Sequence, residues 1–104
     1  MSGKYILEEK TPVLTDDLLE WAKWLENADR RVAKTTLPNG VEVSTVFLGL
    51  DHSFSEGKPL LFETMIFGGE HDTYQERYTT WEEAEAGHQR AIELASDDKA
   101  KKEA

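Results

Sequence analysis

Two apolar stretches in the middle of the chain set the pattern of the predicted fold. The first runs from Val41 to Leu50 and is rich in β-branched and aromatic residues, which suit a pleated, half-buried surface. The second runs from Leu60 to Phe67 and is apolar on both of its alternating faces. Leu60, Phe62 and Ile66 point one way, and Leu61, Met65 and Phe67 point the other. This pattern predicts that the second stretch is an inner strand of a sheet.

Two further stretches carry apolar residues at helical spacing. The first helix is expected from about Asp16 to Ala28, because Thr15 and the aspartates after it can cap free N–H groups. Its apolar stripe consists of Leu18, Trp21, Ala22 and Leu25, widened by Leu14, Leu19 and Trp24. The second helix opens at Thr79 or Thr80, since each has a glutamate three residues later and could form a capping box. Its inward stripe consists of Trp81, Ala84, His88, Ala91 and Ala95.

Shorter segments complete the expected sheet. Val32 to Leu37 is a plausible strand, and the Asn39-Gly40 pair after it tolerates positive φ, so we predict a hairpin turn there. Thr73 to Tyr78 alternates polar and aromatic residues, as a fourth, more exposed strand would. Lys4 to Leu7 could add a strand at a sheet edge, and Thr11 to Leu14 is expected to lead directly into the first helix.

This order of elements predicts an α+β fold. Strands joined by short loops pair as neighbours, so we expect a three- to four-stranded antiparallel β-meander. Each helix has one apolar stripe to bury, and we expect both helices to pack on one face of the sheet. Residues 1–96 are predicted to form a single domain, and residues 97–104 a polar, frayed C-terminal tail.

The charge and the lack of cysteine narrow the classes of function. Twelve Lys and Arg against 21 Asp and Glu give a net charge of −9 over 104 residues, which disfavours binding to nucleic acid or anionic membranes. That charge serves solubility first, and it is compatible with a basic protein partner. The absence of cysteine excludes disulfides and thiolate chemistry. No stretch resembles a signal peptide or a membrane span, so we expect a cytoplasmic protein.

The loop between the two central strands holds the first candidate site residues. Asp51, His52 and Ser53 invite a catalytic interpretation, but neighbours along an extended chain point in opposite directions, and Asp and Ser are common in turns. A metal site could combine His52 and His71 with Asp51, Asp72 or Glu63. The histidines lack the spacing of a helical metal site, and the strand between the two loops could hold His52 and His71 at opposite ends of the sheet. We therefore predict neither a metal nor another cofactor.

Two residues within predicted elements also attract attention. Glu63 lies inside an apolar strand, where it must be paired or neutral if it faces the core, and Arg30, Arg31 or Arg77 could pair with it. If it faces solvent, the open side of the sheet would carry it with Glu42, Ser44 and Thr64 when the registers agree. His88 lies on the apolar stripe of the last helix, which favours a half-buried packing role. The paired tryptophans of the first helix are likewise expected to pack against the sheet.

Several short motifs together resemble a small protein family common in tailed bacteriophages and prophages. The motifs are Ala28 to Ala33, Val43 to His52, Leu61 to Met65, Phe67 to Gly69, Glu76 to Tyr78, Thr80 to Ala84 and Gly87-His88. They lie between Trp21 and His88, which is most of the chain. The family has no assigned activity, so the resemblance implies a phage origin and the cytoplasm of a bacterial host, without any catalytic residues.

Two functional hypotheses follow. The first is a phage accessory protein that binds another protein, of the host or of the phage, in one form as an inhibitor of host defence. The second is a small metal-dependent or acid–base enzyme that uses the Asp51-His52 loop and Glu63. The candidate binding residues are Asp51, His52, Ser53, Glu63 and His71. Apolar residues on both faces of the strands also predict a patch that a homodimer could bury.

Overall fold

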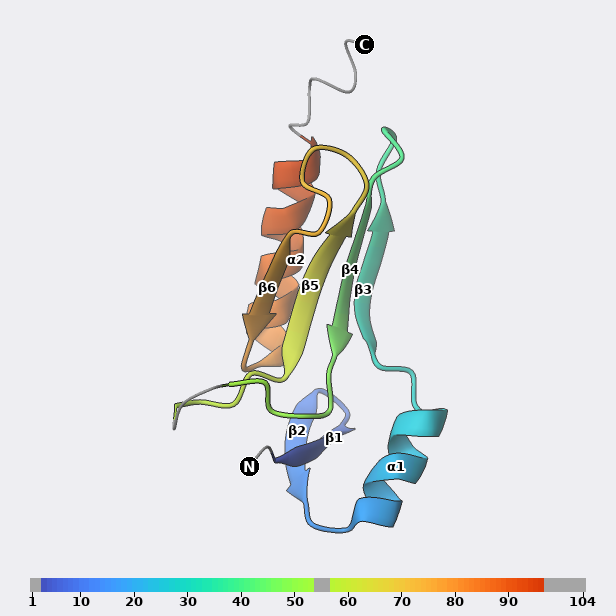
Figure 1. Ribbon diagram of the computed structural model, residues 1–104, viewed down its shortest axis with the longest axis vertical. Coiled ribbons are helices and arrows are strands. Elements are labelled where there is room, and N and C mark those ends of the chain that lie inside the picture. Colours follow the sequence, from blue (N-terminus) through green and yellow to red (C-terminus); the bar gives the residue numbers. More distant parts are fainter. Residues whose placement is uncertain (1–2, 54–56, 97–104) are drawn as a thin grey trace.

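The computed structural model describes residues 3–53 and 57–96, which form six strands and two helices (Figure 1). The elements are β1 (Lys4–Glu8), β2 (Thr11–Thr15), α1 (Leu18–Asn27), β3 (Arg31–Thr36), β4 (Glu42–Phe47), β5 (Phe62–Phe67), β6 (Gln75–Tyr78) and α2 (Trp81–Ser96). The predicted tail 97–104 and positions 54–56 of the predicted central loop lie outside the described residues. Neither helix is long and apolar enough to span a membrane.

The predicted antiparallel meander is confirmed. Its four strands lie in the order β3-β4-β5-β6, and every neighbouring pair is antiparallel. The Asn-Gly turn lies where expected, with the Gly40 N–H donating to the Leu37 carbonyl at 2.9 Å and the Leu37 N–H donating to the Val41 carbonyl at 2.8 Å. Thr45 on β4 lies directly opposite Thr64 on β5, and this register decides what the core contains.

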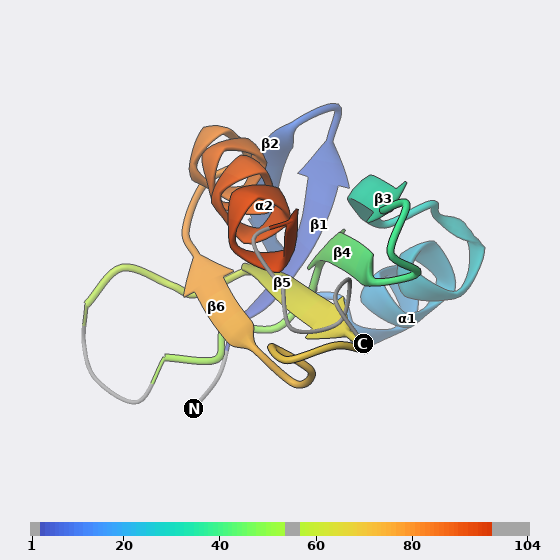
Figure 2. The ribbon, with the colours of Figure 1, turned by 90° about the horizontal axis from the view of Figure 1, so that it is seen from above.

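Only the second helix takes its expected place on the sheet. Figure 2 shows α2 lying over the four-stranded sheet, and α2 contacts all four strands. Helix α1 lies beyond the end of the meander and packs against β1, so the expectation that both helices lie side by side on one face is met by α2 alone. Trp24 of α1 reaches the end of the sheet, where its ring meets that of Phe47 edge-on at 5.7 Å. Trp24 thus packs against the sheet as predicted, whereas Trp21 donates its indole N–H to the Gly49 carbonyl.

The N-terminal segment differs from the prediction, because Thr11–Thr15 is a strand and not a lead into the helix. It pairs with β1 in a separate two-stranded hairpin, in which the non-donating Pro12 lies opposite Leu7. The carbonyl of Gly49 is one of the groups that join the hairpin to the rest of the molecule, beside the hydrogen bond from the Asp51 N–H to the Gly3 carbonyl at 3.0 Å. The Gly49 oxygen accepts from the Tyr5 N–H at 2.8 Å and from the Trp21 indole N–H at 3.0 Å. A single peptide group after β4 therefore anchors both β1 and α1.

The core under α2 consists of two apolar clusters. One cluster contains Leu37, Val41, Val43, Ile66, Ala91 and Ala95. The other contains Phe47, Leu61, Phe62, Tyr78 and Ala84, with Tyr5, Leu7, Trp24, Val32 and Trp81 packed against it. The apolar stripe predicted for the last helix is confirmed, because its alanines and His88 are buried. Between the clusters lies a row of polar side chains, which is described below.

Candidate functional site

The Asp51 carboxylate organises the loop between β4 and β5. Its Oδ1 accepts from the N–H groups of Ser53 and Leu60, both at 2.9 Å, and the His52 N–H donates to the Leu60 carbonyl at 3.0 Å. Burial by itself raises the pKa of the Asp51 carboxyl, but the hydrogen bonds from the Ser53 and Leu60 backbone together lower it by more, so the pKa lies below its ordinary value. Asp51 is therefore an ionised carboxylate whose hydrogen bonds hold the two ends of the loop together.

Replacing Asp51 by alanine is expected to lower the free energy of unfolding by about 1–2 kcal/mol, because two backbone donors lose a charged acceptor. Denaturant unfolding measures this directly. His52→Ala is the matched control in the same loop and is expected to change stability by less than about 0.5 kcal/mol. Equal effects of the two substitutions on stability would contradict this stabilising role of the Asp51 carboxylate.

Glu63 faces the side of the sheet away from α2, where it is paired across the strands. Its Oε2 accepts from the Arg77 Nε at 3.0 Å and also from the Gln75 side-chain amide. Arg77 was one of the three arginines predicted as partners. Glu42 and Ser44 share this open face with Glu63, because they lie opposite Phe67 and Met65, whereas Thr64 points to the core.

The five predicted site residues do not form one site. Asp51, His52 and Ser53 share a loop at one end of β5, and His71 lies in the turn after the other end, 3.8 Å from Glu70. Glu63 takes its partners from β6. No group of three or more His, Asp and Glu side chains within residues 3–53 and 57–96 is arranged to hold a metal ion.

His88 is the most completely bonded side chain of the core. Only 2% of its surface is exposed, its Nε2 lies 3.0 Å from the Thr35 hydroxyl, and its Nδ1 lies 2.7 Å from the Thr45 hydroxyl. The Thr45 and Thr64 hydroxyls are in turn 2.5 Å apart. His88 is therefore buried more deeply than predicted, since one threonine of β3 and one of β4 supply the polar partners that a buried imidazole needs.

The polar row continues to the edge of the sheet through Tyr78. Its hydroxyl also hydrogen-bonds with Thr64, and it donates to the Glu76 carboxylate at 3.1 Å. Burial, and to a lesser extent the neighbouring Glu76, raises the pKa of Tyr78 to about 12. Glu76 also accepts from the Tyr74 hydroxyl at 3.0 Å and from Arg90 at 3.2 Å. We call Thr35, His88, Thr45, Thr64, Tyr78 and Glu76 the polar row.

Sequence reasoning did not find the polar row. A signal for it exists, because Thr45 and Thr64 interrupt two apolar strands and His88 interrupts an apolar helix stripe. Such interruptions indicate a shared polar contact only when the strand register is known. Thr45 and Thr64 lie in separate strands, and nothing local places them opposite each other.

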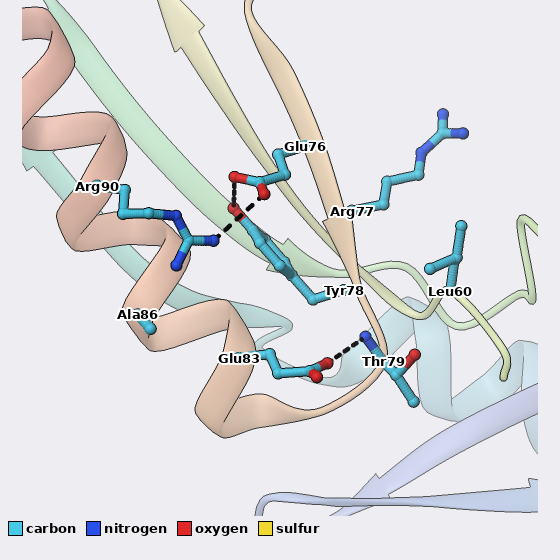
Figure 3. Close-up of a pocket in the computed structure, with 8 residues that line it drawn as sticks. All are labelled: Leu60, Glu76, Arg77, Tyr78, Thr79, Glu83, Ala86 and Arg90. Atoms are coloured by element: carbon cyan, nitrogen blue, oxygen red, sulfur yellow. Dashed lines mark hydrogen bonds and ion pairs between the residues drawn. The ribbon is translucent and has the colours of Figure 1, made fainter.

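A pocket of about 380 Å³ opens between β6 and α2 (Figure 3). It is lined by Leu60, Glu76, Arg77, Tyr78, Thr79, Glu83, Ala86 and Arg90. Glu83 closes one end by accepting from the N–H groups of Thr79 and Thr80 at 3.0 and 3.2 Å, and those bonds lower its pKa. The Glu83 N–H donates back to the Thr80 hydroxyl at 3.0 Å, so the capping box begins at Thr80.

Large apolar side chains are exposed at the junction of β2 and α1. Leu14, Leu18 and Leu19 are 58%, 57% and 76% exposed, and they follow one another across the junction of β2 and α1. At this junction the Asp17 N–H donates to the Thr15 hydroxyl, which donates to Glu20. We call these three residues the leucine surface. Phe67, at the end of β5, is also exposed.

Comparisons of the chain with models of known protein families, with curated proteins and with solved structures found no match. The case for a function therefore rests on the geometry and on the motifs of the sequence.

Proposed function

We propose that this protein is a phage or prophage accessory protein that works in the bacterial cytoplasm by binding another protein. The leucine surface carries the proposal. Three largely exposed leucines within six positions are costly to leave in water, at about 1.5–3 kcal/mol for each side chain that a partner could bury. Inhibition of a host defence protein is one form that this binding takes.

The charge of the chain favours a basic partner. With a net charge of −9, the protein attracts positively charged surfaces over distances of about 8–10 Å at physiological salt. Acidic residues also adjoin the leucines, with Asp16, Asp17 and Glu20 between or next to them. An apolar centre with a charged rim is the usual anatomy of a protein interface. We therefore expect a partner with an apolar patch bordered by Lys and Arg.

The test is affinity capture from phage-infected bacteria, with the captured partner then purified for calorimetry. Wild-type protein is compared with the double variant Leu18→Lys/Leu19→Lys and with Phe67→Lys, a matched change at an exposed apolar residue elsewhere. The double variant is expected to bind the partner at least about tenfold more weakly, because two apolar contacts are lost and two repelling charges are added. Phe67→Lys is expected to bind as the wild type does. Failure of the wild type to retain any partner would refute the proposal.

We also propose that a second copy of the chain can bury the open face of the sheet. That face carries Met65 and the exposed Phe67, and its paired charges, Lys34 with Glu42 and Glu63 with Arg77, cancel. A neutral face is where two copies of an acidic chain repel each other least. Sedimentation at high protein concentration is expected to show a dimer that Phe67→Lys weakens. A strict monomer would rule this out.

A further inference from the structure

The groove between β6 and α2 combines a strand edge with a pocket. β6 is the last strand of the meander, and on its outer side no strand of the described chain pairs with it. The pocket of about 380 Å³ lies beside it, against α2. Figure 3 shows Glu83, Ala86 and Arg90 along the helix side of the groove, with Tyr78 and Thr79 on the strand side.

The backbone of β6 shows which groups point outward. The Ile66 N–H donates to the Tyr74 carbonyl at 3.1 Å, and the Leu61 N–H donates to the Tyr78 carbonyl at 2.8 Å. Residues of an antiparallel strand bond alternately to one neighbour and to the other. Because even-numbered residues of this segment bond to β5, Gln75 and Arg77 direct their N–H and C=O groups away from the sheet.

The side chains of an added strand would meet two different surroundings. Alternate residues of a strand point to opposite faces, so every second residue of a strand beside β6 would point towards α2. The pocket lies beside β6, with Ala86 on the helix side and Leu60 across the strand as its aliphatic lining. Its arginines already have carboxylate partners, Arg77 with Glu63 and Arg90 with Glu76. The pocket therefore suits the aliphatic stem of a long side chain better than a free anion.

We propose that an extended, basic segment of a partner protein adds as a strand to the outer edge of β6 and places one side chain in the pocket. Addition to an edge strand supplies main-chain hydrogen bonds, and the neighbouring pocket supplies selectivity. A basic segment is favoured over a second copy of this chain, because two copies would each carry a charge of −9. The inference rests on the proposed function only in taking the partner to be a protein, and it concerns a surface separate from the leucine surface.

A matched pair of substitutions at Arg77 isolates the backbone contact. Arg77→Pro removes an N–H that points outward, so the bonds between β5 and β6 remain, whereas Arg77→Ala keeps that N–H. Both variants lose the ion pair with Glu63 equally. Gln75→Pro repeats the test at the other outward-pointing residue. Ala86→Phe fills the pocket from an exposed helix position and leaves the strand edge intact.

The probe is a displayed library of short random peptides, selected on the wild-type protein. We expect the selected peptides to be rich in Lys and Arg and to bind Arg77→Ala within about threefold of wild type. Binding to Arg77→Pro, Gln75→Pro and Ala86→Phe is expected to be weaker by at least about tenfold. Hydrogen exchange of the Arg77 amide should slow when a selected peptide binds.

Two results would overturn the inference. One is equal binding of the selected peptides to Arg77→Pro and Arg77→Ala, and the other is a selection that yields no binding peptide. Either result, together with a lysate partner that depends on Leu18 and Leu19, would refute strand addition and leave the proposed function standing. Peptides that bind as expected, without any lysate partner, would support the edge site and refute the proposed function.

Discussion

Replacing Gly87 by alanine is expected to lower the free energy of unfolding by about 1–3 kcal/mol. In an ordinary helix interior the same change raises stability by about 0.5–1 kcal/mol, so the expected sign is reversed. A Cβ at this position would lie 2.0 Å from the hydroxyl oxygen of Tyr78 and 2.2 Å from its Cζ. The ring or the helix must therefore move, and the hydrogen bond from Tyr78 to Glu76 is strained or lost.

A double-mutant cycle tests whether the clash with the Tyr78 ring causes this loss of stability. In a Tyr78→Ala background, Gly87→Ala should show the normal stabilisation of a helix, because the clashing ring is gone. Denaturant unfolding of the four proteins gives the coupling energy of the cycle, which we expect to exceed about 2 kcal/mol. Tyr78→Phe gives a useful comparison, since it removes only the hydroxyl and keeps the ring carbon that clashes. A stabilising Gly87→Ala in the wild-type protein would contradict this close packing.

Replacing His88 by alanine is expected to lower the free energy of unfolding by about 3 kcal/mol or more. The substitution leaves a cavity under α2 and removes the partners of the Thr35 and Thr45 hydroxyls. His88→Gln keeps one polar group near these hydroxyls and should lose less. Equilibrium unfolding of both variants measures the difference. An alanine variant as stable as the wild type would show that the polar row adds nothing to stability.

His88 also makes stability depend on pH in a definite direction. Burial lowers the pKa of its imidazole below the ordinary value of 6.5. The unfolded chain therefore binds a proton at this residue at a pH where the folded protein does not. Stability is complete above pH 6.5 and falls as the pH drops from there through the folded-state pKa, by at most about 1.4 kcal/mol per pH unit.

The pH dependence is measured as the difference in unfolding free energy between wild type and His88→Gln from pH 7.5 down to about 5. We expect the wild type to lose stability faster than the variant below about pH 6.5, because the variant has no imidazole at this position to protonate. Curves that stay parallel over this range would show that burial of His88 has no effect on its proton affinity.

The polar row also helps to set the register of the sheet. Side chains of a strand alternate between its faces, so a slip by one residue would turn Thr64 towards solvent and Glu63 towards the core. In the observed register Thr64 meets Thr45, and Glu63 meets Arg77. Both the buried and the open face of β5 thus favour the same pairing.

The sequence by itself determined the elements whose causes are local. The Asn39-Gly40 turn, the inner position of β5 in the sheet, and the apolar stripe of the last helix all depend on neighbouring residues, and all are confirmed. The antiparallel meander follows from these, because successive strands with no helix between them usually pair as neighbours. The Asp51 loop was also recognised as a cluster, since its members are adjacent in the chain.

Only the tertiary structure decided the features that depend on contacts between distant residues. Thr11–Thr15 pairs with β1, although its local sequence would equally suit a segment that leads into the helix. Helix α1 lies where the Gly49 carbonyl accepts the hydrogen bond from Trp21. Two further features depend on the register between separate strands. They are the pairing of Glu63 with Arg77 and the alignment of three threonines with His88. The groove beside β6 exists because α2 packs over the sheet next to that strand. Local preferences act over a few residues, whereas each of these contacts joins segments that only the folded chain brings together.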